Sequence, residues 1–383
     1  MTRILLIGNY PADEQHSMLR YARWLDAMLN ARGYEAEIIQ PRIRFGRLAG
    51  SSPVLRKWLG YIDKYLVFPI RLMMIAPRFD LVHICDHSNA PYQAFVDTRR
   101  LMITCHDLIA VKAALGIGDG TRPRWSGRVQ QRWILRSLKN IGFICCVSKA
   151  TAKDVADLVG SDNRHIHNRH IQCILNPCFG YSPMAESEAE RIIADAHLSI
   201  RAPFFLHIGS NLWYKNRQGV VAIFRNLADR ELFESHELVL AGPKLSDSLL
   251  REVSDNSISS RIQQAVDPSA KLLNALYCKA AALLFPSLQE GFGWPIVEAQ
   301  ACGCPVITSN REPMLEVGGA AAFYIDPNDP LAAARQIEEG WSWICSQRDS
   351  SLENARRFSE SSIANQYLEL YKRVAESSMK GSR

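Results

Sequence analysis

The feature that most constrains the fold is a repeated alternation of short apolar segments with longer helical patterns. It begins at the N-terminus, where the apolar run at 3–7 is followed by Gly8 and by a helical pattern over 18–31. Gly33 ends that helix, and a second apolar run follows at 36–39. Short buried strands joined by crossover helices are typical of a parallel sheet covered on both faces. We therefore predict an α/β fold with a doubly wound sheet.

The alternation continues along the chain and divides it in two. Further strands are predicted at 81–84, 101–104, 142–147 and 171–175, and then at 204–208, 238–240, 282–285 and 305–308. The stretch between these sets is rich in Ala, Ser and Glu, and 383 residues exceed what one hydrophobic core usually organises. We predict a Rossmann-like domain over 1–180, a linker over 181–200, a second Rossmann-like domain over 201–358 and a C-terminal helix over 359–383, which packs back toward the N-terminal domain.

The composition indicates in which cellular compartment the protein works. The ten cysteines lack the paired spacing of a zinc ribbon, the first apolar run is too short for a signal peptide, and no run of 18 uncharged apolar residues occurs. We expect a cytoplasmic protein. His165, His167 and His170 are close enough in sequence to bind a metal, but their polar neighbours favour an exposed loop.

One segment carries most of the chemical information. After the strand predicted at 282–285 the chain reads PSLQEGFGWPIVEA, with glycines that leave the backbone open and a proline that suits the first position of a helix. The N–H groups and the dipole at such a helix start favour a diphosphate. Glu290 and Glu298 flank this turn, and their carboxylates suit sugar hydroxyls. The alternative of two ordinary surface glutamates is weakened by the glycines and by Pro295.

This segment resembles the signature of the family 4 glycosyltransferases. Their GT-B fold places two Rossmann-like domains around a central cleft. Further motifs of the resemblance lie along most of the chain: Thr104–Leu108, Val147–Lys149, Ile208–Ser210, Lys215, Asn216, Ala241–Pro243, Arg357–Ser359, Tyr367 and Tyr371. The resemblance implies a retaining transfer of a hexose, such as mannose or glucose, from a GDP- or UDP-linked sugar to a polysaccharide precursor or glycolipid acceptor.

The resemblance also implies roles for single residues. In the donor site, Glu298 would bind the ribose, Lys215 would neutralise the diphosphate, and Glu290 would hold the transferred sugar and the phosphates. The remaining donor-site residues would be Gly209, Ser210, Gly291, Phe292 and Gly293.

On the acceptor side, His106 would contact the sugar, with Asp107 either fixing the tautomer of His106 or serving the fold. The loop from Gly8 and Asn9 to Ser17 would approach the acceptor.

Two departures from the family pattern are visible. Ser210 stands where many members have an arginine, and Asn9 stands where many have a second glycine. No Asp-x-Asp pair that could hold a metal occurs in the chain. We therefore predict that no metal or other cofactor is needed, because Lys215 and the helix terminus would neutralise the leaving phosphate.

The charge is unevenly distributed. The first 180 residues carry 25 Lys and Arg against 14 Asp and Glu, whereas the rest carries 20 against 25. Segment 41–78 holds eight basic residues and one acid, Asp63, interleaved with aromatic and aliphatic residues, and segment 122–139 adds six basic residues. This pattern is typical of contact with an anionic membrane surface, here the inner face of the cytoplasmic membrane. The alternative is a pair of ordinary helices packed into the domain.

Other functions stay open. A sugar-metabolic GT-B enzyme, either a transferase to a small acceptor or a nucleotide-sugar epimerase, would need no basic amphipathic segment. A catalytically silent nucleotide-sugar-binding subunit is favoured only by the missing arginine after Gly209. No nucleic-acid partner is expected from a chain of ordinary overall charge.

Overall fold

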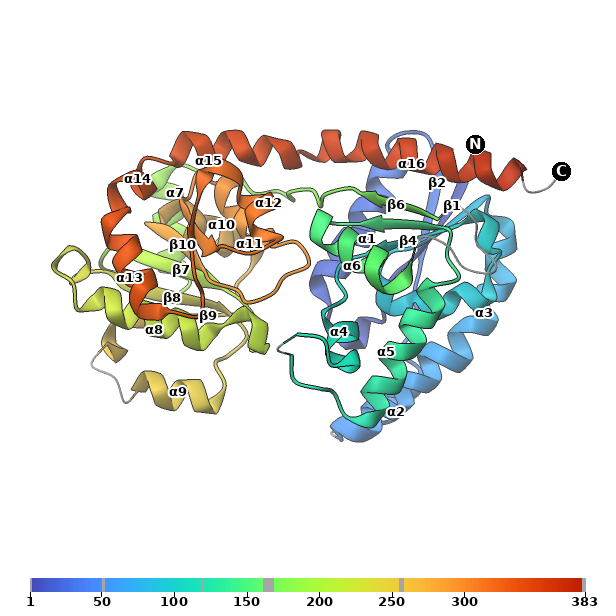
Figure 1. Cartoon of the computed structure of the whole chain (residues 1–383), viewed down its shortest axis with the longest axis horizontal. Coiled ribbons are helices and arrows are strands. Elements are labelled where there is room, and N and C mark those ends of the chain that lie inside the picture. The colour runs from blue at the N-terminus through green and yellow to red at the C-terminus, as the bar shows by residue number, and fades with distance from the viewer. Residues whose placement is uncertain (1, 50–51, 119, 161–168, 255–257, 381–383) are drawn as a thin grey trace. The chain divides into compact units, whose positions relative to one another are not determined.

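The chain folds into two compact units. The computed structural model describes residues 2–49, 52–118, 120–160, 169–254 and 258–380. One unit comprises Met1–Leu175 with Ala364–Arg383, and the other comprises Asn176–Ile363. Within the described residues each unit is built on one six-stranded sheet, and all neighbouring strands in both sheets are parallel. Helices cover both sheets (Figure 1).

The first sheet has the strand order β2-β1-β3-β4-β5-β6. Its central strands are buried along nearly their whole length, as expected for a sheet covered on both faces. The strands are β1 (Arg3–Ile7), β2 (Glu35–Ile39), β3 (Leu81–Ile84), β4 (Leu101–Cys105), β5 (Phe143–Cys146) and β6 (His170–Cys173). The helices are α1 (His16–Asn30), α2 (Pro53–Ile62), α3 (Phe68–Ile75), α4 (Ile109–Leu115), α5 (Trp125–Leu138) and α6 (Lys149–Val159).

The C-terminal helix α16 (Glu360–Lys380) contributes buried tyrosines to this unit. The Tyr371 hydroxyl lies 2.6 Å from Nδ1 of His83, and the Tyr367 hydroxyl lies 2.5 Å from that of Tyr21. Thr104 joins the two contacts, 2.8 Å from Nε2 of His83 and 2.9 Å from the Tyr21 hydroxyl. A connected set of buried polar groups therefore holds the part of α16 around Tyr367 and Tyr371 on the first unit.

The second sheet has the order β12-β11-β10-β7-β8-β9. Its strands are β7 (Phe204–Ile208), β8 (Glu237–Gly242), β9 (Ile262–Val266), β10 (Ala282–Phe285), β11 (Val306–Ser309) and β12 (Ala322–Ile325). The helices are α7 (Glu186–Asp195), α8 (Arg217–Ala228), α9 (Asp247–Ser254), α10 (Ala270–Lys279), α11 (Trp294–Ala301), α12 (Met314–Gly318), α13 (Pro330–Glu339), α14 (Trp341–Cys345) and α15 (Arg348–Ala355). The parallel α/β prediction is confirmed, but β9 and β12 were not predicted.

Residues 181–200, predicted as a linker, lie within the second unit. They include α7, which packs against α10. Lys279 of α10 donates to the carboxylates of Glu186 and Glu190 on α7, at 2.6 and 3.0 Å. This stretch is therefore part of the packed unit.

Two further predictions concern the histidine cluster and membrane-spanning helices. His165 and His167 lie outside the described residues, while His170 begins β6 and stacks on Phe143 with ring centres 4.8 Å apart. Among the residues that the structure describes, no helix is long and apolar enough to cross a membrane.

Candidate active site

The topology of the second sheet brings two predicted segments to one place. The strand order reverses between β7 and β10, and ligands of open α/β sheets bind beyond the carboxyl ends of the strands at such a point. Gly209, Ser210 and Lys215 follow β7, and Glu290 follows β10. The backbone N–H of Leu288 donates to the Tyr214 carbonyl at 2.7 Å, so the two loops are tied together.

Lys215 and Glu290 form an ion pair in this place. The Lys215 Nζ lies 2.7 Å from Oε1 and 2.9 Å from Oε2 of Glu290. The side chains are 19% and 8% exposed, so water screens the pair only in part. The ammonium also lies 5.5 Å from the centre of the Phe285 ring. The structure therefore places a cation and a hydrogen-bond acceptor together at the reversal point.

Helix α11 starts directly beside this pair in the sequence. Gly293 precedes the helix with φ of 99°, a left-handed conformation that favours glycine. The sequence predicted Pro295 at the first position of this helix. In the structure Trp294 is the first residue of α11, so Pro295 occupies the second position. Proline is tolerated there because the N–H groups of the first turn have no partner within the helix. Of the other predicted loop residues, Phe292 is buried and packs edge-on against Phe358.

Glu298 is oriented by a hydrogen bond from a tyrosine. It lies in α11 and is only 4% exposed. The Tyr277 hydroxyl of α10 donates to its Oε2 at 2.9 Å. Burial and the neighbouring Glu298 charge raise the pKa of Tyr277 well above its usual value, so the hydroxyl stays a donor. This contact orients one carboxylate oxygen and was not anticipated from the sequence.

The next arginine in the sequence after Gly209 is Arg217. Arg217, at the start of α8, is buried, and its guanidinium donates to the Ala241 and Pro243 carbonyls at 3.1 and 2.8 Å. Arg217 therefore joins the loops after β7 and β8. Gly209 itself has little room, because a Cβ there would lie 2.9 Å from Nε2 of His207.

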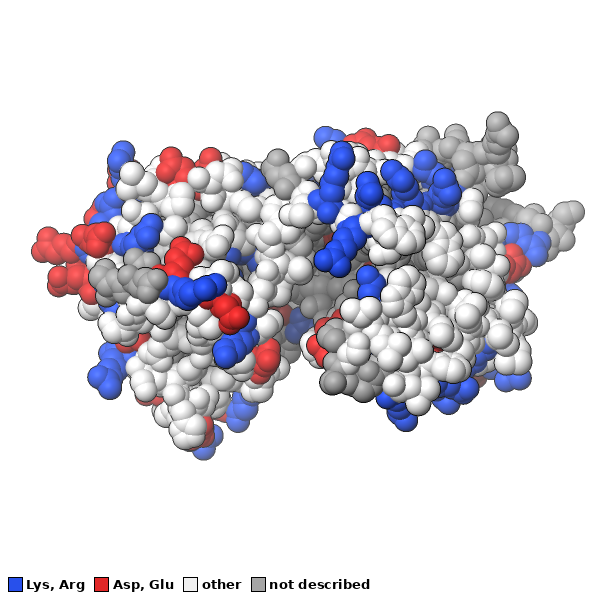
Figure 2. All heavy atoms as spheres, turned by 90° about the horizontal axis from the view of Figure 1, so that it is seen from below, with Lys and Arg blue, Asp and Glu red and all other residues white. Residues whose placement is uncertain are grey.

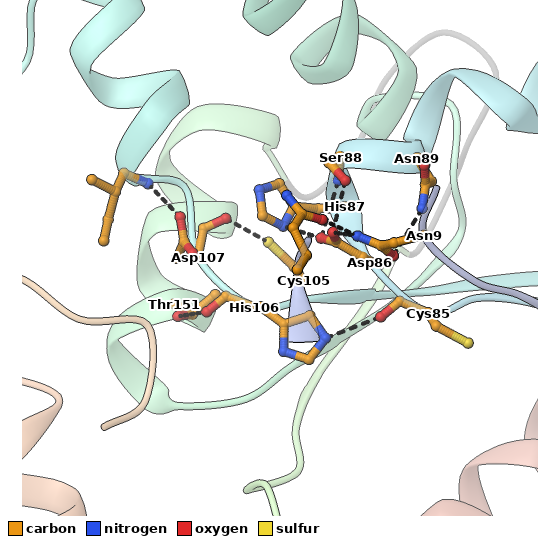
Figure 3. A network of polar contacts seen from close by, with 12 residues as sticks. Asn9, Cys85, Asp86, His87, Ser88, Asn89, Cys105, His106, Asp107 and Thr151 are labelled. Carbon is orange, nitrogen blue, oxygen red and sulfur yellow. Dashed lines mark hydrogen bonds and ion pairs between the residues drawn. The ribbon is translucent and has the colours of Figure 1, made fainter. Parts of the chain in front are cut away.

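A second group of polar residues follows β1, β3 and β4 in the first unit (Figure 3). His106 is buried, and its Nε2 donates to the Cys85 carbonyl at 3.0 Å. Burial lowers the pKa of His106, although the Asp86 charge opposes this, so the neutral ring is favoured. Asp107 serves the fold, because its Oδ1 accepts from the Ile109 N–H at 2.9 Å at the start of α4.

Sequence reasoning missed the acidic centre of this group. Asp86 is 3% exposed, lies 3.0 Å from Nδ1 of His87 and accepts from the Ser88 hydroxyl at 2.7 Å. Burial opposes ionisation of Asp86, but the His87 charge and the hydrogen bonds with His87 and Ser88 lower the pKa of Asp86 below the usual range. The signal that could have found these residues is their position directly after the predicted strand 81–84.

The three predicted residues of the first loop lie in different surroundings. Asn9 is buried, donates to Asp86 and accepts from the Asn89 amide at 3.0 Å, so it belongs to the Asp86 group. Gly8 packs against the side chains of β2 and Gln40. Ser17, however, is exposed and lies in the first turn of α1, because that helix begins at His16. In the part of the chain that the structure describes, no group of three or more His, Cys, Asp or Glu is arranged to hold a metal.

Two family models match the chain. Residues 190–356 match "Glycosyl transferases group 1", and residues 19–168 match "Glycosyltransferase Family 4". The chain is 27% identical to O-antigen chain mannosyltransferase B of Escherichia coli over 65% of both chains. It is 26% identical to the serotype-specific mannosyltransferase WbdA of Escherichia coli over 57% of this chain and 28% of that one. The matches thus span less than two thirds of the length of these relatives.

Solved structures share the fold over nearly the whole chain. Sucrose-phosphate synthase of Thermosynechococcus elongatus gives a TM-score of 0.75 at 19% identity, covering 98% of this chain and 99% of that one. HepE of Anabaena in complex with UDP and glucose gives 0.70 at 15% identity, covering 97% and 100%. These similarities and the two parallel sheets show the GT-B fold. The two family matches, over residues 19–168 and 190–356, show that the chain belongs to the family 4 glycosyltransferases.

Proposed function

We propose that this protein transfers a sugar, mannose in the first instance, from a nucleotide diphosphate during the synthesis of an O-antigen or a related polysaccharide. The observation that carries the proposal is the Lys215–Glu290 pair at the reversal point of the second sheet, next to the start of α11. The names of the mannosyltransferase relatives support the sugar, and the HepE complex with UDP and glucose supports a nucleotide-linked donor.

In the proposed reaction, the second unit binds the donor. The Lys215 ammonium would turn from Glu290 toward the diphosphate, and the N–H groups at the start of α11 would bind phosphate oxygens. Glu290 would then be available to the hydroxyls of the transferred sugar. Glu298, oriented by Tyr277, would bind the ribose hydroxyls.

We further propose transfer with retention of configuration. The bond between the anomeric carbon and the phosphate oxygen breaks, the acceptor oxygen bonds to the same face of that carbon, and its proton passes to the departing phosphate. Lys215 stabilises the negative charge that develops on the phosphate, so the proposed chemistry needs no metal. Activity that survives EDTA unchanged would support this, and activity that requires added Mg²⁺ or Mn²⁺ would contradict it.

Donor hydrolysis tests the enzymatic proposal directly. GDP-mannose, UDP-glucose and UDP-galactose are incubated with the purified protein, and the released nucleotide is measured. We expect one donor to be hydrolysed by the wild type and not by Glu290→Ala. Glu339→Ala, an exposed glutamate of α13 in the same unit, is the matched control and should keep full activity. Hydrolysis by Glu290→Ala at the wild-type rate would remove Glu290 from the site.

We also propose that the first unit contacts an anionic membrane surface that carries a lipid-linked acceptor. Helices α2 and α5 lie together, since Gln130 hydrogen-bonds to both Tyr61 and Tyr65 at 3.2 and 3.1 Å. Large apolar side chains are exposed on α2, on the helical segment Asp63–Val67, on α3 and on α5: Val54, Leu55, Trp58, Leu66, Ile70, Met73, Met74, Trp125, Val129 and Trp133. In Figure 2, basic side chains outnumber acidic ones around a broad uncharged area in the right half.

Exposed apolar residues bordered by arginines suit a membrane interface, where the apolar groups insert and the guanidinium groups meet lipid phosphates. Flotation with vesicles tests this proposal. Binding to vesicles of phosphatidylglycerol and phosphatidylethanolamine at low salt is expected, with little binding to neutral vesicles. Absence of binding to both would leave these helices as an unusually apolar protein surface.

A further inference from the structure

A pocket rich in arginine lies beside the first loop of the first unit. It has a volume of about 540 Å³ and is lined by Arg42, Arg44, Arg47 and Arg71, with Pro11 and Gln40 on the side of the loop that follows β1. This volume falls within the range usual for small-molecule sites. The Gln40 side chain also packs against Gly8. The pocket therefore adjoins the loop after β1, which is predicted to approach the acceptor.

The four guanidinium groups of this pocket form no ion pair with a carboxylate in the part of the chain that the structure describes. Arg71 is half-buried, and its pKa is lowered by burial and by the positive charge of Arg42, an effect that Glu37 offsets only in part. Like charges gathered with only a partial counter-charge, here that of Glu37, destabilise the free protein and favour an anionic ligand.

Asp63, the one acidic residue of segment 41–78, fixes the turn that carries Arg44 of the pocket. Asp63 is 1% exposed and accepts three backbone hydrogen bonds, from Arg44, Phe45 and Gly46, each at 3.0 Å. It accepts a fourth from the Tyr10 hydroxyl at 2.9 Å. Asp63 is therefore occupied by the backbone of the turn and by the first loop, and it leaves the arginine side chains to a ligand. Burial opposes ionisation of Asp63, but these bonds lower its pKa and keep it charged.

We propose that this arginine pocket binds the phosphate or diphosphate group of an anionic acceptor. Guanidinium groups bind phosphate oxygens in pairs, and four of them match a group with several such oxygens. The exposed apolar side chains of α2 and α3 follow directly in the sequence, so a lipid chain attached to the phosphate would find apolar surface on the same unit. The inference rests on the proposed transferase function, whose acceptor it specifies.

Calorimetry with inorganic pyrophosphate tests the pocket. Because the donor site also binds phosphates, the measurement uses Lys215→Ala/Glu290→Ala as the parent protein. Adding Arg44→Gln and Arg71→Gln should weaken binding by about tenfold or more, since each removes charge-assisted hydrogen bonds. Arg132→Gln with Arg136→Gln, two exposed arginines of α5, makes the same change in net charge and should leave binding within about twofold of the parent.

Two further arms identify the source of the phosphate. Farnesyl diphosphate should compete with pyrophosphate, whereas farnesol should not. If instead Arg44→Gln/Arg71→Gln loses vesicle binding while binding of farnesyl diphosphate is unchanged, the pocket serves membrane headgroups and the acceptor assignment is wrong. Equal pyrophosphate binding by pocket and control variants would overturn the inference. Donor hydrolysis by wild-type protein, measured alongside, reports on the proposed function separately.

Discussion

At the scale of residues, the proposed donor site contains a lysine, Lys215, that is already paired in the free protein. Its partner Glu290 is only 8% exposed, so removing Lys215 leaves a largely buried carboxylate without its cation. The two residues therefore form one unit, and each single substitution changes the state of the other.

Lys215→Ala should abolish most of the stabilisation that GDP or UDP gives to the wild type. The loss of a charged hydrogen bond to phosphate is worth about 1.5–3 kcal/mol, or at least tenfold in affinity. Thermal shift with both nucleotides measures it. Lys279→Ala, which removes a lysine paired on the surface with Glu186 and Glu190, is the control and should bind nucleotide normally. Nucleotide binding by Lys215→Ala equal to that of the control would show that the helix start suffices.

The Asp86–His87 pair predicts a pH dependence of stability. Burial lowers the pKa of His87, but the Asp86 charge, with a smaller contribution from Asp107, raises it overall above its ordinary value of 6.5. A raised pKa in the folded state adds stability that is complete below 6.5 and is lost as the pH rises through the folded pKa. The depressed pKa of Asp86 adds stability above about 3.8, lost only at lower pH.

The destabilisation caused by His87→Gln should therefore be larger at about pH 5.5 than at about pH 9. Urea unfolding of both proteins at the two pH values gives the difference. His16→Gln, at the exposed start of α1, should show no such change. A destabilisation that is independent of pH would mean that His87 is neutral throughout and acts only as a hydrogen-bond donor.

At the scale of elements, the apolar runs located ten of the twelve described strands, because buried parallel strands are continuously apolar. The two that were missed lie at opposite edges of the second sheet. β9 reads IQQAV, and its residues are mostly half-buried, so it has too little apolar character to stand out. β12 reads AFYI but pairs with β11 alone. Edge strands are fixed by pairing, which local sequence does not display.

The sequence likewise predicted some residues of the candidate site and missed others. The glycines, Glu290 and Glu298 were visible because a strand, a turn and a helix start carry a local pattern. The support from Tyr277 was not visible, because it depends on the packing of α10 beside α11. The Asp86 group was not visible, because it depends on which strands become neighbours in the sheet. Sequence spacing alone does not reveal such contacts, which here join residues 21 and 80 positions apart.

Gly293 tests whether the start of α11 is needed for donor binding. Alanine at φ of 99° costs about 1–2 kcal/mol, and its Cβ would lie 3.3 Å from Cδ1 of Ile296. We expect Gly293→Ala to lower stability by that amount and to weaken nucleotide binding. Gly142→Ala is the control, because nothing lies within 4 Å of a Cβ there, and it should bind nucleotide normally. Destabilisation without any loss of binding would separate the helix start from the donor.

The attachment of α16 can be tested through a single hydroxyl. Tyr371→Phe removes the partner of His83 Nδ1 in a fully buried place and should lower the free energy of unfolding by about 1–3 kcal/mol. Lys372→Ala, the exposed neighbour in the same helix, should change it by less than about 0.5 kcal/mol. Urea denaturation decides, and equal stability of the two variants would contradict a role for the buried hydrogen-bonded set.

At the scale of the whole molecule, the charge asymmetry and the exposed apolar side chains make different predictions about membrane contact. The first 180 residues carry the excess of basic residues, and attraction to an anionic surface weakens as salt screens it. Insertion of apolar side chains does not weaken in this way. Vesicle flotation at about 50 and about 500 mM salt therefore separates the two contributions.

We expect binding of the wild type to phosphatidylglycerol vesicles to fall, but not to vanish, at the higher salt. Trp58→Ser should remove most of the remainder, because this tryptophan is 53% exposed on α2 and its insertion does not depend on charge. Trp343→Ser is the matched control: this residue is 42% exposed in the second unit and should leave flotation unchanged at both salt concentrations. If the two variants float alike, the basic residues alone hold the protein on the vesicle, and the exposed apolar side chains of the first unit need another partner.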